Sequence, residues 1–273
     1  GIRYANKINA VSPNYAQELL SPLGSHYLFD EFNRRRNDVS GILNGCDYTQ
    51  WDPATDGNIV AQYDYSNLAG KKHCKNDLQK NVGLPENDNL PIIGMVCRLT
   101  EQKGFAFIMP ILELLLRHQF QLVIIGTGDP EISDALRNAA AKHQSKFAFI
   151  EDFSVRKAHM IEAGSDLFLM PSLFEPCGLN QMYSLAYGTL PIVRAVGGLK
   201  DTVIDLADDP ESATGFVFVE PSGEALLACV ERALLFYYES PDVFESTQKK
   251  AMLSRFTWED AAKNYEGLYL GAL

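Results

Sequence analysis

Short apolar runs alternate with amphipathic stretches from residue 92 to the end of the chain. The apolar runs hold no charged residue, which is typical of strands that are covered on both faces. The predicted strands are 92–97, 122–126, 147–150, 167–171, 190–193 and 215–219. Strand, helix and strand at this spacing predict right-handed crossovers and therefore a parallel sheet in an α/β fold.

Amphipathic stretches of helical period fill the gaps between these strands. The predicted helices are 105–118, 131–143, 157–162, 179–187 and 199–206, followed by 222–238, 243–254 and 258–268. Loops after the strands of such a sheet share one edge, which is where open α/β sheets bind ligands. Four of these loops carry the candidate chemistry.

The first ninety residues follow a different pattern. A strand is predicted over 7–11, a helix capped by Ser12 and Pro13 up to about Leu20, and a polar helix over 63–83. The basic cluster at 33–37 is interpreted as a solvated surface loop. Turn signals between 44 and 53 predict a loop-rich crossing segment, so residues 1–44 are expected to be the tail of a preceding domain.

Composition narrows the class of partner. With 46% hydrophobic and 22% charged residues the chain is globular, and its net charge of −11 argues against nucleic acid and anionic membranes as partners. The five cysteines are scattered without a Cys-x-x-Cys pair, which favours a reducing compartment over a disulfide framework or a zinc site. No apolar run approaches a membrane span, and no basic-then-apolar leader opens the chain. The first residue is glycine and not methionine, so we expect a fragment of a longer protein.

The first candidate loop, 97–104, holds Arg98 and Lys103 at the start of a helix. Cations there are unfavourable for the helix dipole and call for a bound anion. A diphosphate fits, because arginine offers a planar fork and lysine a point charge. The alternative is a surface pair that forms salt bridges with Glu101.

Two further loops are rich in glycine. Gly126 and Gly128 would let a ligand approach the backbone, although a tight strand-to-helix turn is an equal alternative and the third glycine of a dinucleotide fingerprint is absent. Gly197 and Gly198 open a helix and predict a backbone anion nest.

The remaining loop, 171–181, places a carboxylate beside a predicted phosphate site. Glu175 would repel a phosphate unless it faces sugar hydroxyls or a developing sugar cation, and no cation lies next to it in sequence. Cys177 is interpreted as a packed residue and not a nucleophile, because no histidine adjoins it. His159 is expected to be structural, and Phe153 either stacks on a base or packs in the core.

Together these segments resemble bacterial glycogen synthase and plant starch synthase. The resemblance rests on Arg-Leu-Thr-Glu-Gln-Lys-Gly (98–104), Gly-Thr-Gly-Asp-Pro (126–130), Phe-Glu-Pro-Cys-Gly-Leu (174–179), Tyr-Gly-Thr-Leu-Pro-Ile-Val-Arg (187–194) and Gly-Gly-Leu-Lys-Asp-Thr-Val (197–203). It implies the Rossmann-like, doubly wound C-terminal domain of a GT-B enzyme, a retaining transferase that moves glucose from ADP-glucose to the non-reducing end of an α-1,4-glucan. The Lys-x-Gly-Gly-Leu motif of the family's first domain is absent from this chain, so the chain is expected to be inactive alone.

The resemblance also implies a division of the chain and a place for it in the cell. Residues 1–44 would be the tail of the N-terminal domain, 45–256 the donor-binding domain, and 257–273 a helix that packs back toward the first domain. The location would be the cytoplasm of a bacterium, or the plastid of a plant. A non-catalytic nucleotide-sugar-binding module and a GT-B enzyme that uses a UDP-sugar remain alternatives.

Residue roles follow from the same resemblance. Arg98 and Lys103 would bind the distal phosphate of the donor, Glu175 would contact the glucose, and Phe153 would cover the adenine. The other expected contacts are Asn44 to the sugar, Gly126 and Gly128 beside the nucleotide, Cys177, Gly178 and Leu179 through their backbone, and the nest at Gly197 and Gly198. Two positions depart from many relatives: Tyr183 replaces a second glutamate and Val196 a threonine. No Asp-x-Asp motif lies near these loops, so no metal cofactor is expected.

Overall fold

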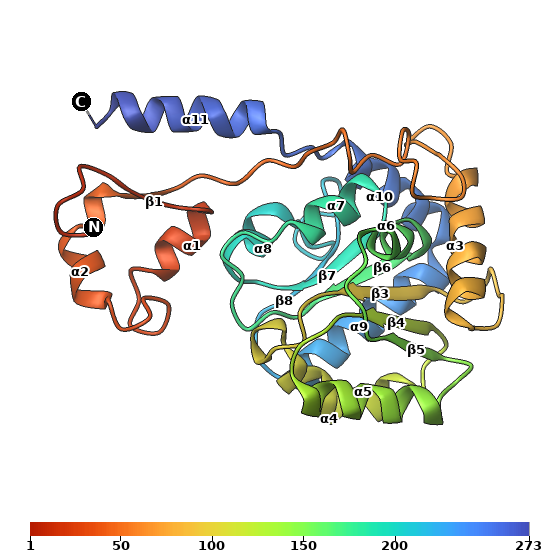
Figure 1. The fold of residues 1–273 in the computed structure, drawn as a ribbon. Helices are drawn as coiled ribbons and strands as arrows, with labels where there is room; N and C mark the ends of the chain where they lie inside the picture. Colours follow the sequence, from red (N-terminus) through yellow and green to blue (C-terminus); the bar gives the residue numbers. More distant parts are fainter. Residues whose placement is uncertain (273) are drawn as a thin grey trace.

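A six-stranded parallel sheet forms the larger part of the computed structural model, which describes residues 1–272 (Figure 1). Its strands are β3 (Ile92–Val96), β4 (Gln121–Ile125), β5 (Phe147–Ile150), β6 (Leu167–Met170), β7 (Leu190–Arg194) and β8 (Phe216–Phe218). Each lies within one residue of its predicted bounds, and every neighbouring pair is parallel. The α/β class and the Rossmann-like, doubly wound sheet are confirmed.

The strand order, β5-β4-β3-β6-β7-β8, contains one reversal of direction. The chain adds β4 and β5 on one side of β3 and then returns to place β6 on its other side. Ile93 pairs with Leu167 and Gly94 with Phe168 at that junction. The loop after β3 and the loop after β6 therefore leave the sheet in opposite directions, which opens a crevice at its carboxyl edge.

Helices cover both faces of the sheet (Figure 1). The helices of this part are α3 (Ala69–Val82), α4 (Phe105–Leu115), α5 (Pro130–Lys142), α6 (Val155–Gly164), α7 (Asn180–Ala186), α8 (Gly197–Thr202), α9 (Gly223–Glu239) and α10 (Pro241–Leu253). Alternate residues of one strand enter different cores: Leu122 packs in the cluster of α4 and α9, and Val123 in the cluster of α3, α6 and α8. This two-sided burial explains why the strands read as continuous apolar runs.

The N-terminal residues form a small unit of their own. It contains β1 (Ile8–Ala10), α1 (Pro13–Glu18), α2 (Phe29–Arg34), the 3-10 turn η1 (Arg36–Asp38) and β2 (Val39–Gly41), with β1 and β2 paired in parallel. Ser12 caps α1 as predicted, accepting a hydrogen bond from the Tyr15 backbone N–H. Neither α2 nor β2 was predicted from the sequence.

The basic cluster at residues 33–37 corrects one interpretation. Arg35 is not a solvated side chain, because its guanidinium donates hydrogen bonds to the backbone carbonyls of Ile2, Arg3 and Ala5 and pairs with Asp38. These hydrogen bonds from the planar guanidinium of Arg35 hold the first residues of the chain against η1. The prediction of a free surface loop is therefore wrong for this residue.

A long crossing segment joins the unit to α3, and the last helix returns beside it. The Cys46 N–H donates to the Phe256 carbonyl where the two segments meet, at 2.8 Å. The last helix, α11 (Trp258–Leu270), then lies next to the N-terminal unit (Figure 1). There Asn9 donates to the Tyr265 hydroxyl at 3.1 Å. The predicted domain boundaries at 44 and 256 fall on these segments and stay predictions.

The edge of the sheet at β8 depends on one buried carboxylate. Asp205 pairs with both terminal nitrogens of Arg232 on α9, at 2.5 and 2.7 Å, and accepts the Val217 N–H. Burial alone would raise the pKa of Asp205, but the hydrogen bonds of Arg232 and of the Ala207 and Val217 backbone outweigh it and hold the pKa below its usual value.

Asp205→Asn should therefore lower the free energy of unfolding by about 1.5–3 kcal/mol, the range for hydrogen bonds to charged groups. Because its pKa is lowered on folding, ionised Asp205 stabilises the fold at pH values above the ordinary aspartate pKa of about 4. This contribution is lost as the pH falls through the pKa that Asp205 has in the folded state. Urea unfolding of both proteins between neutral and acid pH measures it. Equal midpoints at pH 7 would contradict the assignment.

Candidate functional site

Two loops at the carboxyl edge pack backbone to backbone across the β3–β6 junction. The Leu173 N–H donates to the Gln102 carbonyl at 2.8 Å, and the Gln102 side chain donates to the Phe174 carbonyl. Gly104 has a φ of +83°, and a Cβ placed there would lie 2.0 Å from the Pro171 carbonyl oxygen. Only glycine fits such a turn against another backbone. The loop after β3 is thereby fixed to the loop after β6.

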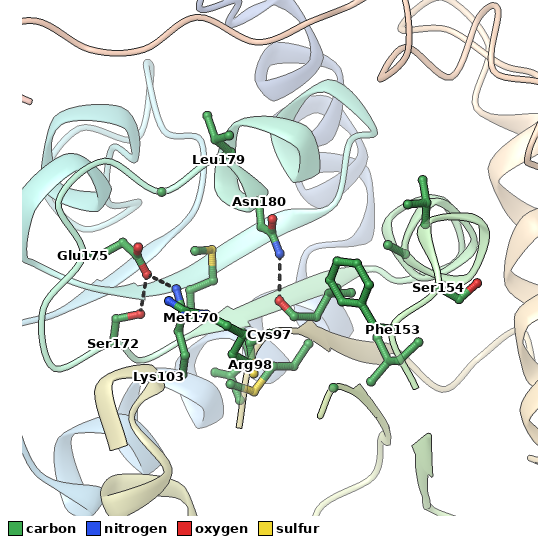
Figure 2. A pocket seen from close by; sticks show the side chains of 18 of the residues that line it. Cys97, Arg98, Lys103, Phe153, Ser154, Met170, Ser172, Glu175, Leu179 and Asn180 are labelled. Atoms are coloured by element: carbon green, nitrogen blue, oxygen red, sulfur yellow. Dashed lines mark hydrogen bonds and ion pairs between the residues drawn. The ribbon is translucent and has the colours of Figure 1, made fainter. Parts of the chain in front are cut away.

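This packing brings Lys103 to Glu175. Its Nζ lies 2.5 Å from Oε2 of Glu175, and the Ser172 hydroxyl donates to the same oxygen at 3.0 Å (Figure 2). Glu175 is only 6% exposed. A buried carboxylate requires such partners, because an uncompensated charge would be costly in this environment. The cation that the sequence did not show beside Glu175 comes from 72 residues away.

Arg98 behaves differently from Lys103. It is exposed at the same edge of the sheet and makes no ion pair with any residue in the range 1–272. The alternative that both cations pair with Glu101 is not observed, since Lys103 pairs with Glu175. The loop therefore presents one cation engaged with a carboxylate and one available to an anion.

A pocket of about 320 Å³ lies over this part of the sheet edge. Its lining includes Arg98, Lys103, Gly126, Phe153, Glu175, Gly178 and Leu179 from the predicted set, with Trp51, Cys97, Asp152, Ser154, Val155, Ala158, Ser172 and Asn180 among the others. Figure 2 shows Lys103, Glu175 and Ser172 toward one end and Phe153 and Ser154 toward the other. The pocket thus has a charged end and a more apolar end.

Phe153 stands at the more apolar end with 84% of its surface exposed. It therefore does not pack in the core, which was the alternative considered for it. A large exposed aromatic ring at a pocket edge offers a flat face to a planar ligand group.

The nest predicted at Gly197 and Gly198 is corrected by the structure. The Gly197 N–H donates to the Glu18 carboxylate of α1 at 2.7 Å, and the Gly198 N–H donates to the Glu175 carbonyl at 3.1 Å. Both donors are therefore used within the chain. Neither glycine lines the pocket; they support the backbone beneath Glu175.

Three other predicted residues also lie behind the pocket surface. Gly128 forms a bridge with Leu99 that extends the pairing of the strands before them. Cys177 is buried, and burial raises the pKa of its thiol although the Asn44 backbone N–H partly offsets this. A thiol of raised pKa fits the interpretation of Cys177 as a packed residue. Asn44 contacts that thiol through its backbone, and its own side chain does not line the pocket.

The lining residues that were not predicted from the sequence include Ser172, Asn180 and Trp51. Ser172 lies in the loop 171–181, and its place three residues before Glu175 could have marked it as a hydrogen-bond partner of that carboxylate. Asn180 donates to the Val96 carbonyl at 2.7 Å and so ties the start of α7 to the end of β3. Trp51 comes from the crossing segment, whose position no local pattern indicates.

His159 is structural, as expected. It is 2% exposed, and its Nδ1 lies 2.7 Å from Oδ2 of Asp56. Across residues 1–272 no three His, Cys, Asp or Glu side chains are grouped to hold a metal ion, and no helix there is long and apolar enough to cross a bilayer.

Comparisons with known proteins show the family of the chain. The family model for glycosyl transferases group 1 matches residues 77–250. The glycogen synthase of Aeromonas salmonicida is 56% identical over 273 residues, which is 100% of this chain and 56% of that protein. The glycogen synthase of Photobacterium profundum is 54% identical, over 99% of this chain and 54% of its own length.

A solved structure agrees over nearly all of the chain. The catalytic domain of starch synthase IV from Arabidopsis thaliana, bound to ADP and acarbose, has a TM-score of 0.93 and 34% identity, covering 99% of this chain and 56% of that one. The resemblance drawn from the sequence motifs is confirmed. The chain spans a little over half the length of the curated relatives that it matches.

The pair of Lys103 and Glu175 generates a stability prediction. Lys103→Met should lower the free energy of unfolding by about 3–5 kcal/mol, because it leaves a buried carboxylate with Ser172 alone. Glu175→Gln should cost less, since Lys103 is the more exposed partner and can reach water. Urea unfolding of the two single variants and the double variant measures the coupling. Strictly additive effects would show that the pair does not interact.

Proposed function

We infer the function from a family assignment: the chain belongs to the group 1 glycosyl transferases. We propose that it is the donor-binding part of a retaining glucosyltransferase that moves glucose from ADP-glucose to the non-reducing end of an α-1,4-glucan. The glycogen synthase relatives support the reaction, and the starch synthase bound to ADP supports the nucleotide. Because the chain covers 56% of the first relative, glucan transfer is proposed for the whole protein.

The observation that carries this proposal is the two-ended pocket at the β3–β6 junction. An ADP-sugar has a planar base, a dianionic linker and a sugar with several hydroxyls. The Phe153 ring suits the base, and the unpaired Arg98 guanidinium suits the diphosphate. Glu175 at the charged end suits the sugar.

The hydrogen bonds of Glu175 define what it can do. Both Lys103 and Ser172 bind its Oε2. Its Oε1 has no bond to any residue from 1 to 272 and is the oxygen left to accept a sugar hydroxyl. Lys103 pairs with the carboxylate and would at the same time place its charge beside the diphosphate, so the repulsion between two anions would be offset.

The charge movement of the reaction fits this arrangement. Breaking the bond between C1 and the phosphate oxygen puts negative charge on ADP and positive charge on the glucosyl ring. Arg98 and Lys103 would stabilise the first and Glu175 the second, as preorganised groups that need little rearrangement. Retention would follow from attack by the acceptor hydroxyl on the face that ADP leaves, with the leaving phosphate taking the proton. We propose that the two side-chain cations supply the countercharge without a divalent metal ion.

Arg98→Ala should weaken ADP binding by roughly tenfold or more, because a charged hydrogen bond contributes about 1.5–3 kcal/mol. Isothermal titration calorimetry on the 273-residue chain measures this. Arg117→Ala is the matched control, since Arg117 is exposed just beyond the end of α4 and does not line the pocket. Wild-type affinity in Arg98→Ala would reject the diphosphate role.

Base and metal dependence follow in the same assay. ADP should bind more tightly than UDP, because a purine offers the Phe153 ring more stacking area than uracil does. Phe153→Ala should reduce the difference between the affinities for ADP and UDP. Replacing magnesium by EDTA should leave the ADP affinity unchanged. A preference for UDP would favour the UDP-sugar alternative, and loss of binding in EDTA would refute the metal-free proposal.

A further inference from the structure

Trp51 lies between two aromatic rings at the wall of the pocket. Its ring stacks on His159 of α6 at a centroid distance of 3.7 Å with an interplanar angle of 13°. On its other face it stacks on Tyr183 of α7 at 4.1 Å and 6°. The crossing segment thus inserts one flat side chain between two helices. Trp51 also belongs to the lining of the pocket.

A buried polar network holds one side of this stack in place. Oδ2 of Asp56 accepts from the Tyr187 hydroxyl at 2.6 Å and lies 2.7 Å from His159 Nδ1. The Asn58 backbone N–H donates to the other oxygen at 2.7 Å. Burial alone would raise the pKa of Asp56, but these hydrogen bonds outweigh it and hold the pKa below its usual value. The bond from Nδ1 to Asp56, together with the stack on Trp51, holds the His159 ring in place.

The two helices that clamp Trp51 also form the wall of the pocket. α6 contributes Val155 and Ala158 from its first turn, and the start of α7 contributes Leu179 and Asn180. The thickness of one indole ring therefore sets the separation of these two helix starts. Glu175 is bonded to Lys103 and Ser172 at the charged end, whereas the stacking contacts of Trp51 are with His159 and Tyr183.

We propose that Trp51 is a positioning residue that fixes the width of the pocket between α6 and α7 and thereby the affinity for the nucleoside part of the ligand. This proposal rests on the proposed function, because it assumes that a nucleotide occupies the pocket. Under this proposal the network of Asp56, His159 and Tyr187 influences ligand affinity indirectly, because it holds the His159 ring on which the Trp51 indole stacks.

The two tryptophans of the chain allow a direct test. Trp258 lies at the start of α11, half exposed and outside the pocket lining. In Trp258→Phe, Trp51 is the single tryptophan, and under excitation selective for tryptophan ADP should change its fluorescence saturably with the dissociation constant that calorimetry gives. In Trp51→Phe, Trp258 is the single tryptophan and its fluorescence should not respond. Free N-acetyltryptophanamide corrects for absorption by the nucleotide.

Affinity provides the second measurement. Trp51→Ala should weaken ADP binding by roughly tenfold, and Trp51→Phe, which keeps a stacked ring, should recover most of that loss. Asp56→Asn should also weaken ADP binding, because it weakens the hydrogen bond that holds the His159 ring against Trp51. Circular dichroism shows which variants remain folded. A folded Trp51→Ala that binds ADP as the wild type does overturns the proposal.

The emission measurement decides the question if Trp51→Ala does not fold. Unchanged emission of Trp51 at saturating ADP then overturns the proposal, and a saturable change supports it. Failure of the proposed function gives a different result. If the wild-type chain binds no ADP by calorimetry, the proposed function is wrong. If the wild type binds ADP and Trp51→Ala binds it equally well, only the role of Trp51 is wrong.

Discussion

The pairing of β3 with β6 is the constraint on which the rest of the structure depends. Two registered residue pairs, Ile93 with Leu167 and Gly94 with Phe168, join the two halves of the sheet. Because the strands are parallel, both following loops emerge at the same edge, and because the winding reverses here, they leave a crevice between them. The approach of Gly104 to the Pro171 carbonyl then fixes the loops to each other. Every residue at the charged end of the pocket is positioned by this junction.

Charge is distributed across that junction in a way that suits an anionic ligand in an acidic protein. The chain carries a net charge of −11, so a phosphate ligand depends on local cations. Lys103 neutralises Glu175 inside the site, and Arg98 stays available at its edge. The glycine pair at 197–198, which has the form of an anion nest, is already satisfied by Glu18 and by the Glu175 carbonyl. The anion-binding capacity of the pocket therefore resides in side chains more than in that turn.

The crossing segment does more than connect two parts. It supplies Trp51 to the pocket wall, and at its start the Asn44 backbone contacts the Cys177 thiol behind the site. The N-terminal unit also reaches α8, where the Asn14 N–H donates to Asp201 and Glu18 accepts from Gly197. Contacts from outside the sheet thus support both the wall of the pocket and the backbone beneath Glu175.

The sequence by itself determined the strands, most helices, the sheet edge that carries the site and the family. Strand periodicity, the Ser12 cap and the motif residues are local signals, and local signals record which backbone conformation and which face of an element a residue prefers. The strand β2 was missed because Val39, Ser40 and Gly41 include a single apolar residue, and they show no strand pattern until β1 pairs with them. Only the tertiary structure decided which distant side chains meet. The pairing of Lys103 with Glu175, the use of the Gly197 N–H by Glu18 and the stacking of Trp51 on His159 each join residues far apart in the chain. Such contacts are set by packing of the whole fold, and no spacing rule along the sequence encodes them.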